Sequence, residues 1–103
     1  MSRVRILEEA AEEAVEAAAW YESQRPGLGD DFGRALNAAL DLLEADIVPL
    51  VAQTASHDNR LKRLILKRFP YEIVVTEFRE EVVVIAVAHQ SRRPGYWRDR
   101  ELR

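Results

Sequence analysis

Residues 61–97 read LKRLILKRFPYEIVVTEFREEVVVIAVAHQSRRPGYW, and this stretch decides the fold. It holds three runs, 61–69, 71–78 and 81–89, that are rich in Val, Ile, Leu, Phe and Tyr, side chains that fit a pleated and buried surface. Pro70 lacks an N–H group and favours a chain reversal between the first two runs. Arg79-Glu80 occupies the place of a two-residue hairpin turn, although it lacks the Asn-Gly chemistry that such turns prefer. The stretch therefore predicts three antiparallel strands.

The preceding residues predict one strand and two helices. Residues 3–7 alternate enough for a short edge strand, and the Ala- and Glu-rich stretch 8–24 is a strong helix former. Pro26 and two glycines make residues 25–29 a turn, after which Asp30 or Asp31 is expected to cap a second helix. The apolar stripe of that helix consists of Phe32, Leu36, Ala39, Leu40, Leu43 and Ile47. Residues 51–59, with His57, are expected to form a polar surface loop.

Together these elements predict a single α+β domain over residues 1–103. An N-terminal strand, an antiparallel two-helix hairpin and three further strands would form a four-stranded sheet, followed by a short C-terminal tail. The helices would cover one face of the sheet, because a short loop makes them neighbours. The other face is then expected to be a free, shallow, basic groove. The glutamates at the start of the first helix, including Glu13, are expected to form a solvated face favoured by the helix dipole.

Composition narrows the chemistry and the compartment. The chain has no cysteine, which excludes disulfides and Cys-ligated zinc or iron–sulfur sites. No signal-peptide pattern and no apolar run of about 20 residues is present, so a cytoplasmic location is expected. Paired acids for hydrolysis, a Ser or Cys nucleophile with its base, and a His-rich metal cage are also missing. No metal site and no cofactor are therefore predicted.

Charge is divided unevenly between the two halves of the chain. Residues 1–59 carry 4 basic and 12 acidic side chains, a balance of −8, whereas residues 60–103 carry 11 and 6, a balance of +5. Such asymmetry indicates a phosphate backbone or an acidic partner for the basic half. A charged sheet edge that blocks aggregation is the alternative explanation. The candidate nucleic-acid or partner-binding residues are Arg60, Lys62, Arg63, Lys67, Arg93 and Trp97.

Four residues of the basic half are candidates for metal-independent RNA cleavage. Such a site needs a group that takes the 2′-hydroxyl proton, cations for the phosphate and an acid for the leaving oxygen. His89 suits the base or the acid, Arg68 and Arg92 suit the phosphate, and Tyr96 suits base stacking or proton transfer. A hydrogen-bonded structural His89 and a Trp97 that covers the core are the alternatives.

The order of elements, with the segments RLILKRFPYEIVV and VIAVAHQSRRPGYW, resembles the RelE/ParE superfamily of toxins from bacterial type II toxin–antitoxin modules, in the branch labelled plasmid stabilisation proteins. The likeness spans nearly the whole chain. It implies a small toxin that arrests growth and is neutralised by a cognate antitoxin encoded beside it. It also implies that the antitoxin lays an extended or helical segment across the toxin, and the basic half with its exposed apolar positions would suit an acidic, amphipathic partner.

Two activities compete within that superfamily. RelE-like members are ribosome-dependent mRNA endonucleases, and Arg68, Arg92 and Tyr96 match their pattern, but Gln90 stands where a catalytic arginine is expected. ParE-like members poison DNA gyrase, and His89-Gln90-Ser91-Arg92 resembles their His-x-x-Arg, with Arg93 in place of the usual acid. A pI of about 5.4 disfavours docking to ribosomal RNA. The resemblance therefore favours a gyrase poison, with a nuclease or a degenerate toxin that only binds antitoxin as alternatives.

Overall fold

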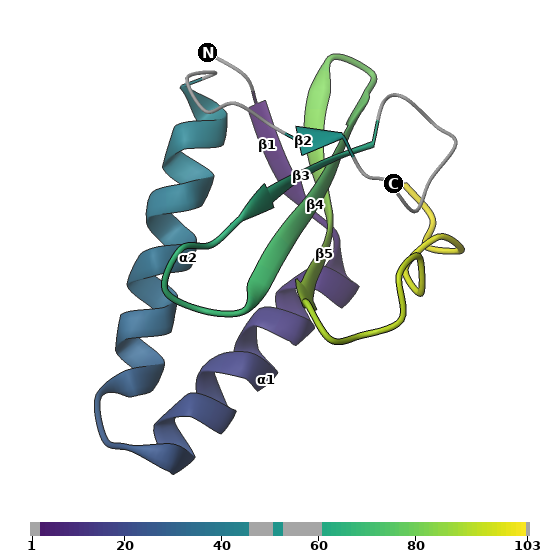
Figure 1. Cartoon of the computed structure of the whole chain (residues 1–103). Coiled ribbons are helices and arrows are strands. Elements are labelled where there is room, and N and C mark those ends of the chain that lie inside the picture. The colour runs from purple at the N-terminus through teal and green to yellow at the C-terminus, as the bar shows by residue number, and fades with distance from the viewer. Residues whose placement is uncertain (1–2, 46–50, 53–60, 103) are drawn as a thin grey trace.

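A computed structural model describes residues 3–45, 51–52 and 61–102. The elements follow the order β1 (Arg3–Ile6), α1 (Glu8–Gln24), α2 (Leu28–Glu44), β2 (Val51–Ala52), β3 (Lys62–Ile65), β4 (Tyr71–Phe78) and β5 (Glu81–His89). Figure 1 shows the two helices on one side of the strands and the C-terminal segment on the other side. The α+β architecture predicted from the sequence is confirmed. No helix in the described part of the chain is both long and apolar enough to cross a membrane.

The sheet is mixed, with the strand order β1-β5-β4-β3-β2. Strands β3, β4 and β5 pair antiparallel as predicted, and β1 pairs with β5 in parallel at one edge. The two-residue strand β2 adds a fifth member at the opposite edge, in a segment predicted to be loop. His57 and Arg60 lie outside the described residues.

Strand β3 is shorter than the predicted run 61–69. It ends at Ile65, and the N–H of Leu66 donates to the carbonyl oxygen of Tyr71 across the start of the turn. Phe69 then enters the core, where its ring lies 4.9 Å from Tyr21 and 5.2 Å from Phe32, centroid to centroid. The predicted reversal at Pro70 is confirmed, but the turn takes four residues that the pattern assigned to the strand.

The second helix begins earlier than predicted, at Leu28, and neither Asp30 nor Asp31 is its cap. Gly27 is the N-cap and adopts a left-handed conformation with φ of 89°. The carboxylate of Glu22, on α1, accepts hydrogen bonds from the N–H groups of Gly27 and Gly29 at 2.9–3.1 Å. This side chain accepts hydrogen bonds from N–H groups that have no partner within α2, and it thereby connects α1 to α2.

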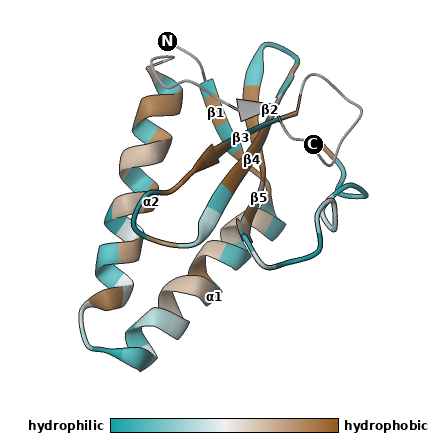
Figure 2. Ribbon diagram, viewed as in Figure 1, coloured by the Kyte–Doolittle hydropathy of each residue, from teal (hydrophilic) through white to brown (hydrophobic). Residues whose placement is uncertain are grey.

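Apolar residues are concentrated in the centre of the sheet, and the tail is mostly hydrophilic (Figure 2). Along β4, Ile73 and Val75 point to one face and Val74 and Thr76 to the other, since strand side chains alternate. All four are buried, so both faces are covered. On the second face, Thr76 shares a small hollow with Trp97 and Leu102 of the C-terminal segment. The prediction of a wholly free second face is therefore wrong.

Candidate functional site: the C-terminal tail and its clasp

Residues 90–102, here called the tail, leave β5 in a series of tight turns. The N–H groups of Arg92, Tyr96, Arg98 and Arg100 each donate to the carbonyl oxygen three residues earlier, at 3.0–3.3 Å. Gly95 has a φ of 80°, which only glycine adopts without strain. The turns bring the tail back along the sheet, where Trp97 is 2% exposed. Trp97 therefore covers the core, as one of the two interpretations of the sequence held.

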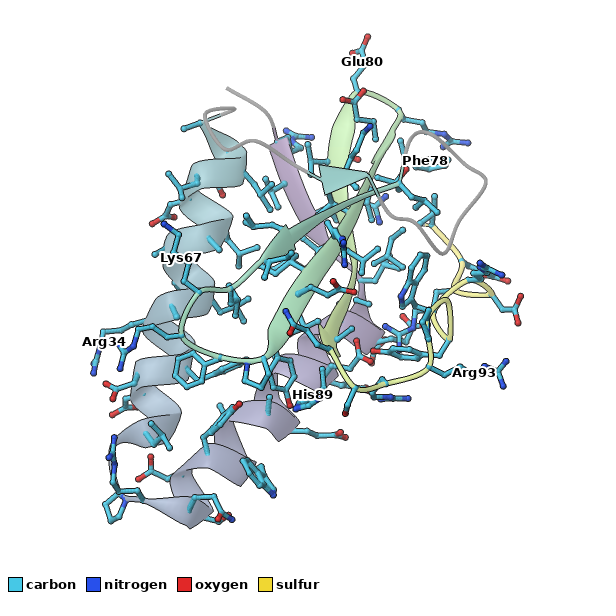
Figure 3. All side chains as sticks on the ribbon, in the orientation of Figure 1. Arg34, Lys67, Phe78, Glu80, His89 and Arg93 are labelled. Atoms are coloured by element: carbon cyan, nitrogen blue, oxygen red, sulfur yellow. The ribbon has the colours of Figure 1, made fainter. Side chains whose placement is uncertain are left out.

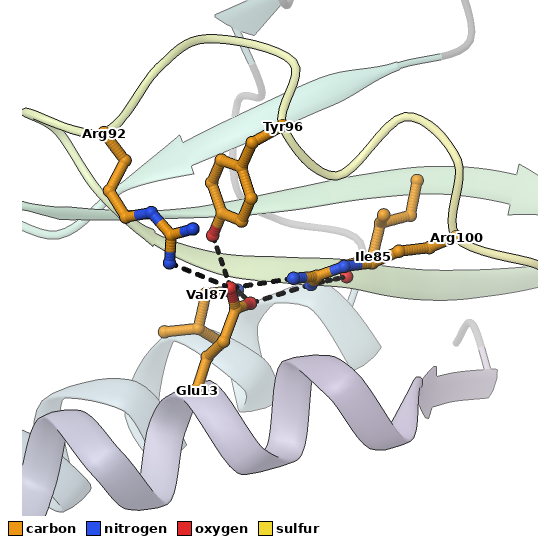
Figure 4. A network of polar contacts seen from close by, with 6 residues as sticks. All are labelled: Glu13, Ile85, Val87, Arg92, Tyr96 and Arg100. Carbon is orange, nitrogen blue, oxygen red and sulfur yellow. Dashed lines mark hydrogen bonds and ion pairs between the residues drawn. The ribbon is translucent and has the colours of Figure 1, made fainter.

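The tail is fixed to the first helix by the carboxylate of Glu13 (Figure 4). Arg100 donates two parallel hydrogen bonds to it, Nη1 to Oε1 at 2.8 Å and Nη2 to Oε2 at 2.9 Å. The Tyr96 hydroxyl donates to Oε2 at 2.5 Å, and the backbone N–H of Val87 donates to Oε1 at 3.0 Å. We call this group, Glu13 with Tyr96 and Arg100, the clasp. Glu13 is thus not part of a solvated helix face, because its side chain is only 13% exposed.

The clasp also completes one edge of β5. Strand β1 covers β5 only as far as Val84, so the backbone groups beyond it need other partners. Arg100 Nη1 donates to the Ile85 carbonyl oxygen at 2.8 Å, and Glu13 accepts from Val87. The pairing of β4 with β5 shifts register at this place, where Val74 faces Ala86 and Val75 faces Val84. Ile85 is therefore the extra residue of a bulge, and Arg100 satisfies its carbonyl group.

The titration behaviour of the clasp follows from these contacts. Burial alone would raise the pKa of Glu13, but the hydrogen bonds from Arg100, Tyr96 and Val87 outweigh burial and lower that pKa below its ordinary value. Burial, followed by the hydrogen bond to the Glu13 carboxylate, raises the pKa of Tyr96 far above its ordinary value. The hydrogen bonds to Glu13 likewise raise the pKa of Arg100. At neutral pH the carboxylate is charged and the phenol is neutral.

Arg92 lies beside the clasp and is more accessible. Its guanidinium carbon is 3.8 Å from the centroid of the Tyr96 ring, and its Nη1 is 3.8 Å from Oε2 of Glu13. The first contact is a close cation–π interaction, and the second is a weak ion pair, since Arg100 already saturates the carboxylate. The Arg92 side chain remains 54% exposed. It therefore has capacity for a further anion.

His89, the last residue of β5, is held on two sides. Its ring packs edge-on against Tyr71 at a centroid distance of 5.1 Å, and its Nδ1 accepts a hydrogen bond from the Ser91 N–H at 3.0 Å. The Ser91 hydroxyl is also 2.7 Å from Nδ1. Because Nδ1 is the acceptor, the proton of neutral His89 is on Nε2. The ring thus presents a donor away from Ser91.

An open groove of about 570 Å³ lies between the tail and the exposed end of the sheet. It is lined by Arg63, Ile65, Glu72, Ala88, His89, Gln90, Arg92, Arg93, Pro94, Tyr96 and Trp97. Arg63 donates from Nη1 to Glu72 Oε2 at 3.1 Å, so the charge on the floor is neutralised. Its Nε is buried and has no hydrogen-bond partner among the described residues. The net positive charge of the groove therefore comes from Arg92 and Arg93 on its rim.

The structure brings together only some of the candidate residues. Six of them line the groove: Arg63, His89, Arg92, Arg93, Tyr96 and Trp97. Lys62 points to the opposite face from Arg63.

Two further candidates, Lys67 and Arg68, are exposed on the β3–β4 turn, where the Arg68 guanidinium lies 5.7 Å from the Phe69 ring centroid. Figure 3 shows Lys67 beside α2 and Arg93 on the far side of the molecule. None of the contacts of the described residues joins Arg68 to Arg92 or Tyr96.

The sequence pattern does not identify Glu13 and Arg100 as partners. They are 87 residues apart, and the Ala/Glu pattern of α1 does not distinguish Glu13 from its neighbours. The position of Glu13 one turn before Ala17, on the buried side of the helix, was the signal available. Within residues 3–45, 51–52 and 61–102, no three His, Cys, Asp or Glu side chains gather in a metal-binding arrangement.

The fold and the tail together define a structural class, in which a helix hairpin packs on a mixed sheet and the last strand continues into a basic tail. Among solved structures, the chain is similar to one described as the chromosomal ParDE TA system from P. aeruginosa, with a TM-score of 0.70 and 15% identity. The match covers 86% of this chain and 96% of that chain. The chain therefore shares its fold with that structure, in agreement with the fold that the sequence resemblance implies. No protein-family model and no curated protein matches the sequence.

Proposed function

We propose that this chain is the toxin of a type II toxin–antitoxin module, and that it arrests growth in the cytoplasm by poisoning DNA gyrase rather than by cutting RNA. An acidic, amphipathic antitoxin neutralises it. The fold shared with a ParDE structure supports the toxin assignment. The clasp is the observation that favours a mode of action without RNA cleavage.

A metal-independent nuclease needs a proton acceptor and cations that are available to the phosphate. The Tyr96 hydroxyl already donates to Glu13, and its raised pKa makes it a poor base near pH 7. Arg92 stacks on Tyr96 and is only weakly paired with the same carboxylate, so it is one accessible cation beside His89. Arg68 lies on the β3–β4 turn, away from both. The Tyr96 hydroxyl is thus engaged in the clasp and the second arginine is separated from the groove, which leaves the set of groups for RNA cleavage incomplete.

Expression of the chain alone in a bacterial host, with mRNA integrity followed by primer extension and DNA supercoiling measured in the same samples, tests this proposal. We expect intact mRNA together with gyrase-linked DNA damage. Tyr96→Phe keeps the aromatic ring and removes only the hydroxyl, so growth arrest should persist. Arg79→Ala, on the distant β4–β5 turn, is the matched control.

The alternative, a RelE-like mRNA endonuclease, is favoured by the shared groove, in which His89, Arg92 and Tyr96 lie together. Codon-phased mRNA breaks that disappear in both Tyr96→Phe and Arg68→Ala would establish this activity and refute the gyrase proposal. If the chain causes neither growth arrest nor damage to RNA or DNA, binding of the antitoxin would be its remaining function.

A further inference from the structure

A second hollow, of about 300 Å³, lies on the helix side of the same residues. Its lining comes from α1 and the end of the sheet, and consists of Glu13, Glu16, Ala17, Trp20, Tyr71, Val87, His89 and Arg92. His89 and Arg92 therefore border both this hollow and the groove described above. The two depressions meet along a ridge formed by these two side chains.

Each depression contains one exposed apolar side chain that the fold does not need. Trp20, in the helix-side hollow, is 58% exposed although its neighbour Tyr21 is buried in the core. Ile65, in the groove, is also exposed. Exposing a Trp side chain forgoes a large amount of hydrophobic burial, and Trp, Tyr and Arg are the residues most enriched at the centres of protein interfaces. Trp20, Tyr71 and Arg92 form such a set.

The charge on the ridge indicates the chemistry of the occupant. On the groove side of the ridge, Arg92 and Arg93 are the cations that remain after Glu72 neutralises Arg63. Arg92 is only weakly paired with Glu13, and the Nε2 proton of His89 points away from Ser91, so both side chains can donate to one carboxylate. Glu16, beside Trp20, disfavours an evenly acidic segment and instead suits an apolar side chain at that end.

We infer that the two hollows form one docking surface for an amphipathic peptide segment, with an apolar side chain against Trp20, a carboxylate on Arg92 and His89, and a second apolar side chain against Ile65. This inference rests on the proposed function, since the antitoxin would supply the segment. It extends the antitoxin contact beyond the basic half to Trp20 of α1, a residue that the charge pattern alone does not indicate.

The probes are 15-residue synthetic peptides that tile the protein encoded beside this chain. Trp20 is exposed and Trp97 is buried, so acrylamide quenching of tryptophan fluorescence reports mainly on Trp20. One peptide should protect the fluorescence. The affinity of a dye-labelled copy of that peptide, measured by fluorescence anisotropy, should fall at least tenfold in Trp20→Ala and in Arg92→Gln. Val15→Ala, at an apolar position on α1 that is even more exposed and lies outside both hollows, should change the affinity less than twofold.

Binding that is unchanged in Trp20→Ala would overturn the inference, as would a Trp20-dependent homodimer in light scattering or competition by an RNA oligonucleotide. Growth arrest, measured separately, distinguishes this failure from failure of the proposed function. A Trp20→Ala chain that still arrests growth but is no longer rescued by the neighbouring protein supports both. Trp20-dependent peptide binding by a chain that does not arrest growth supports the surface and refutes the toxin.

Discussion

The carboxylate of Glu13 accepts hydrogen bonds from two parts of the chain, strand β5 and the tail, and anchors both to α1. A charge taken out of water is tolerated only when it is paired and hydrogen-bonded, and Glu13 meets both conditions. Its partner Arg100 is 16% exposed. If either side chain were removed, the charge of the other would stay largely buried and would have little solvent to stabilise it.

We therefore expect Glu13→Gln to lower the free energy of unfolding by about 2 kcal/mol, since a largely buried guanidinium loses its counter-charge. Urea denaturation followed by circular dichroism measures this change. Glu12→Gln, one position earlier and exposed, should stay within about 0.5 kcal/mol of the parent. Equal effects of the two substitutions would mean that the clasp adds no stability.

The same carboxylate makes stability depend on acid pH. The pKa of Glu13 is lower in the folded than in the unfolded chain, so the folded state binds fewer protons and is favoured above the ordinary pKa of 4.5. This contribution is lost as pH falls below 4.5 through the lowered folded value. The acid limb of a plot of melting temperature against pH should be flatter in Glu13→Gln than in Glu12→Gln, and parallel limbs would contradict the assignment.

At the scale of the elements, the turn between the helices depends on a close approach. An ideal Cβ built on Gly29 would lie 2.6 Å from the backbone carbonyl oxygen of Ala18 on α1, whereas one on Gly33 meets nothing within 4 Å. Both glycines lie in α2, so they form a matched pair for substitution.

Gly29→Ala should lower stability by about 2 kcal/mol, because backbone atoms must move apart, and Gly33→Ala should raise it by about 0.5 kcal/mol through the better helix propensity of alanine. Thermal unfolding of the two variants gives the comparison. Melting temperatures that shift in the same direction would show that the two helices are not held at this separation.

In the β4–β5 turn, the residue types do not suit the backbone conformation. Arg79 and Glu80 both adopt positive φ, 53° and 65°, as a type I′ turn requires. The pair Arg79→Asn with Glu80→Gly should remove about 2 kcal/mol of backbone strain and lose less than about 1 kcal/mol from the contact of Arg79 with the Phe78 ring.

The double variant should thus be more stable by about 1 kcal/mol in urea denaturation. Arg79→Ala alone removes the ring contact without relieving the strain and should be less stable than the parent. A double variant no more stable than the parent would contradict the strained turn.

Local sequence patterns predicted the elements of this fold, because apolar residues repeat with a different period in helices and strands, and residues such as Pro and Gly end an element. The helix over residues 8–24 and the hairpin at Arg79-Glu80 match the structure. The length of β3 was overestimated, since an apolar run does not reveal that Phe69 turns inward to meet Tyr21. The cap of α2 was wrongly predicted, because the N-cap is Gly27 and the carboxylate that accepts from its N–H group belongs to Glu22 on another helix.

The candidate site was only partly predictable for a similar reason. The motif ending in Arg92 and Tyr96 marks the tail, but the partner that restrains both, Glu13, is separated from them by most of the chain. Contacts between distant segments leave no periodic signal. The charge division between the two halves likewise did not show that Arg63 is neutralised by Glu72 across β3 and β4.

At the scale of the whole molecule, the two tryptophans mark opposite roles. Trp97 is 2% exposed and covers the second face of the sheet, while Trp20 is 58% exposed on α1. Trp97→Ala should therefore cost about 3–5 kcal/mol of unfolding free energy and increase binding of a hydrophobic dye, and Trp20→Ala should cost less than about 0.5 kcal/mol. Equal losses in urea denaturation would refute this division of roles.

The clasp joins residues that are 87 positions apart in the chain. Contacts between such distant residues form more slowly during folding than contacts within one helix or hairpin, because a long loop must close first. Until the clasp has formed, the Ile85 carbonyl and the Val87 N–H lack the partners that they have in the folded chain. A partly folded molecule therefore exposes a short, unpaired edge of β5, at which another chain could pair.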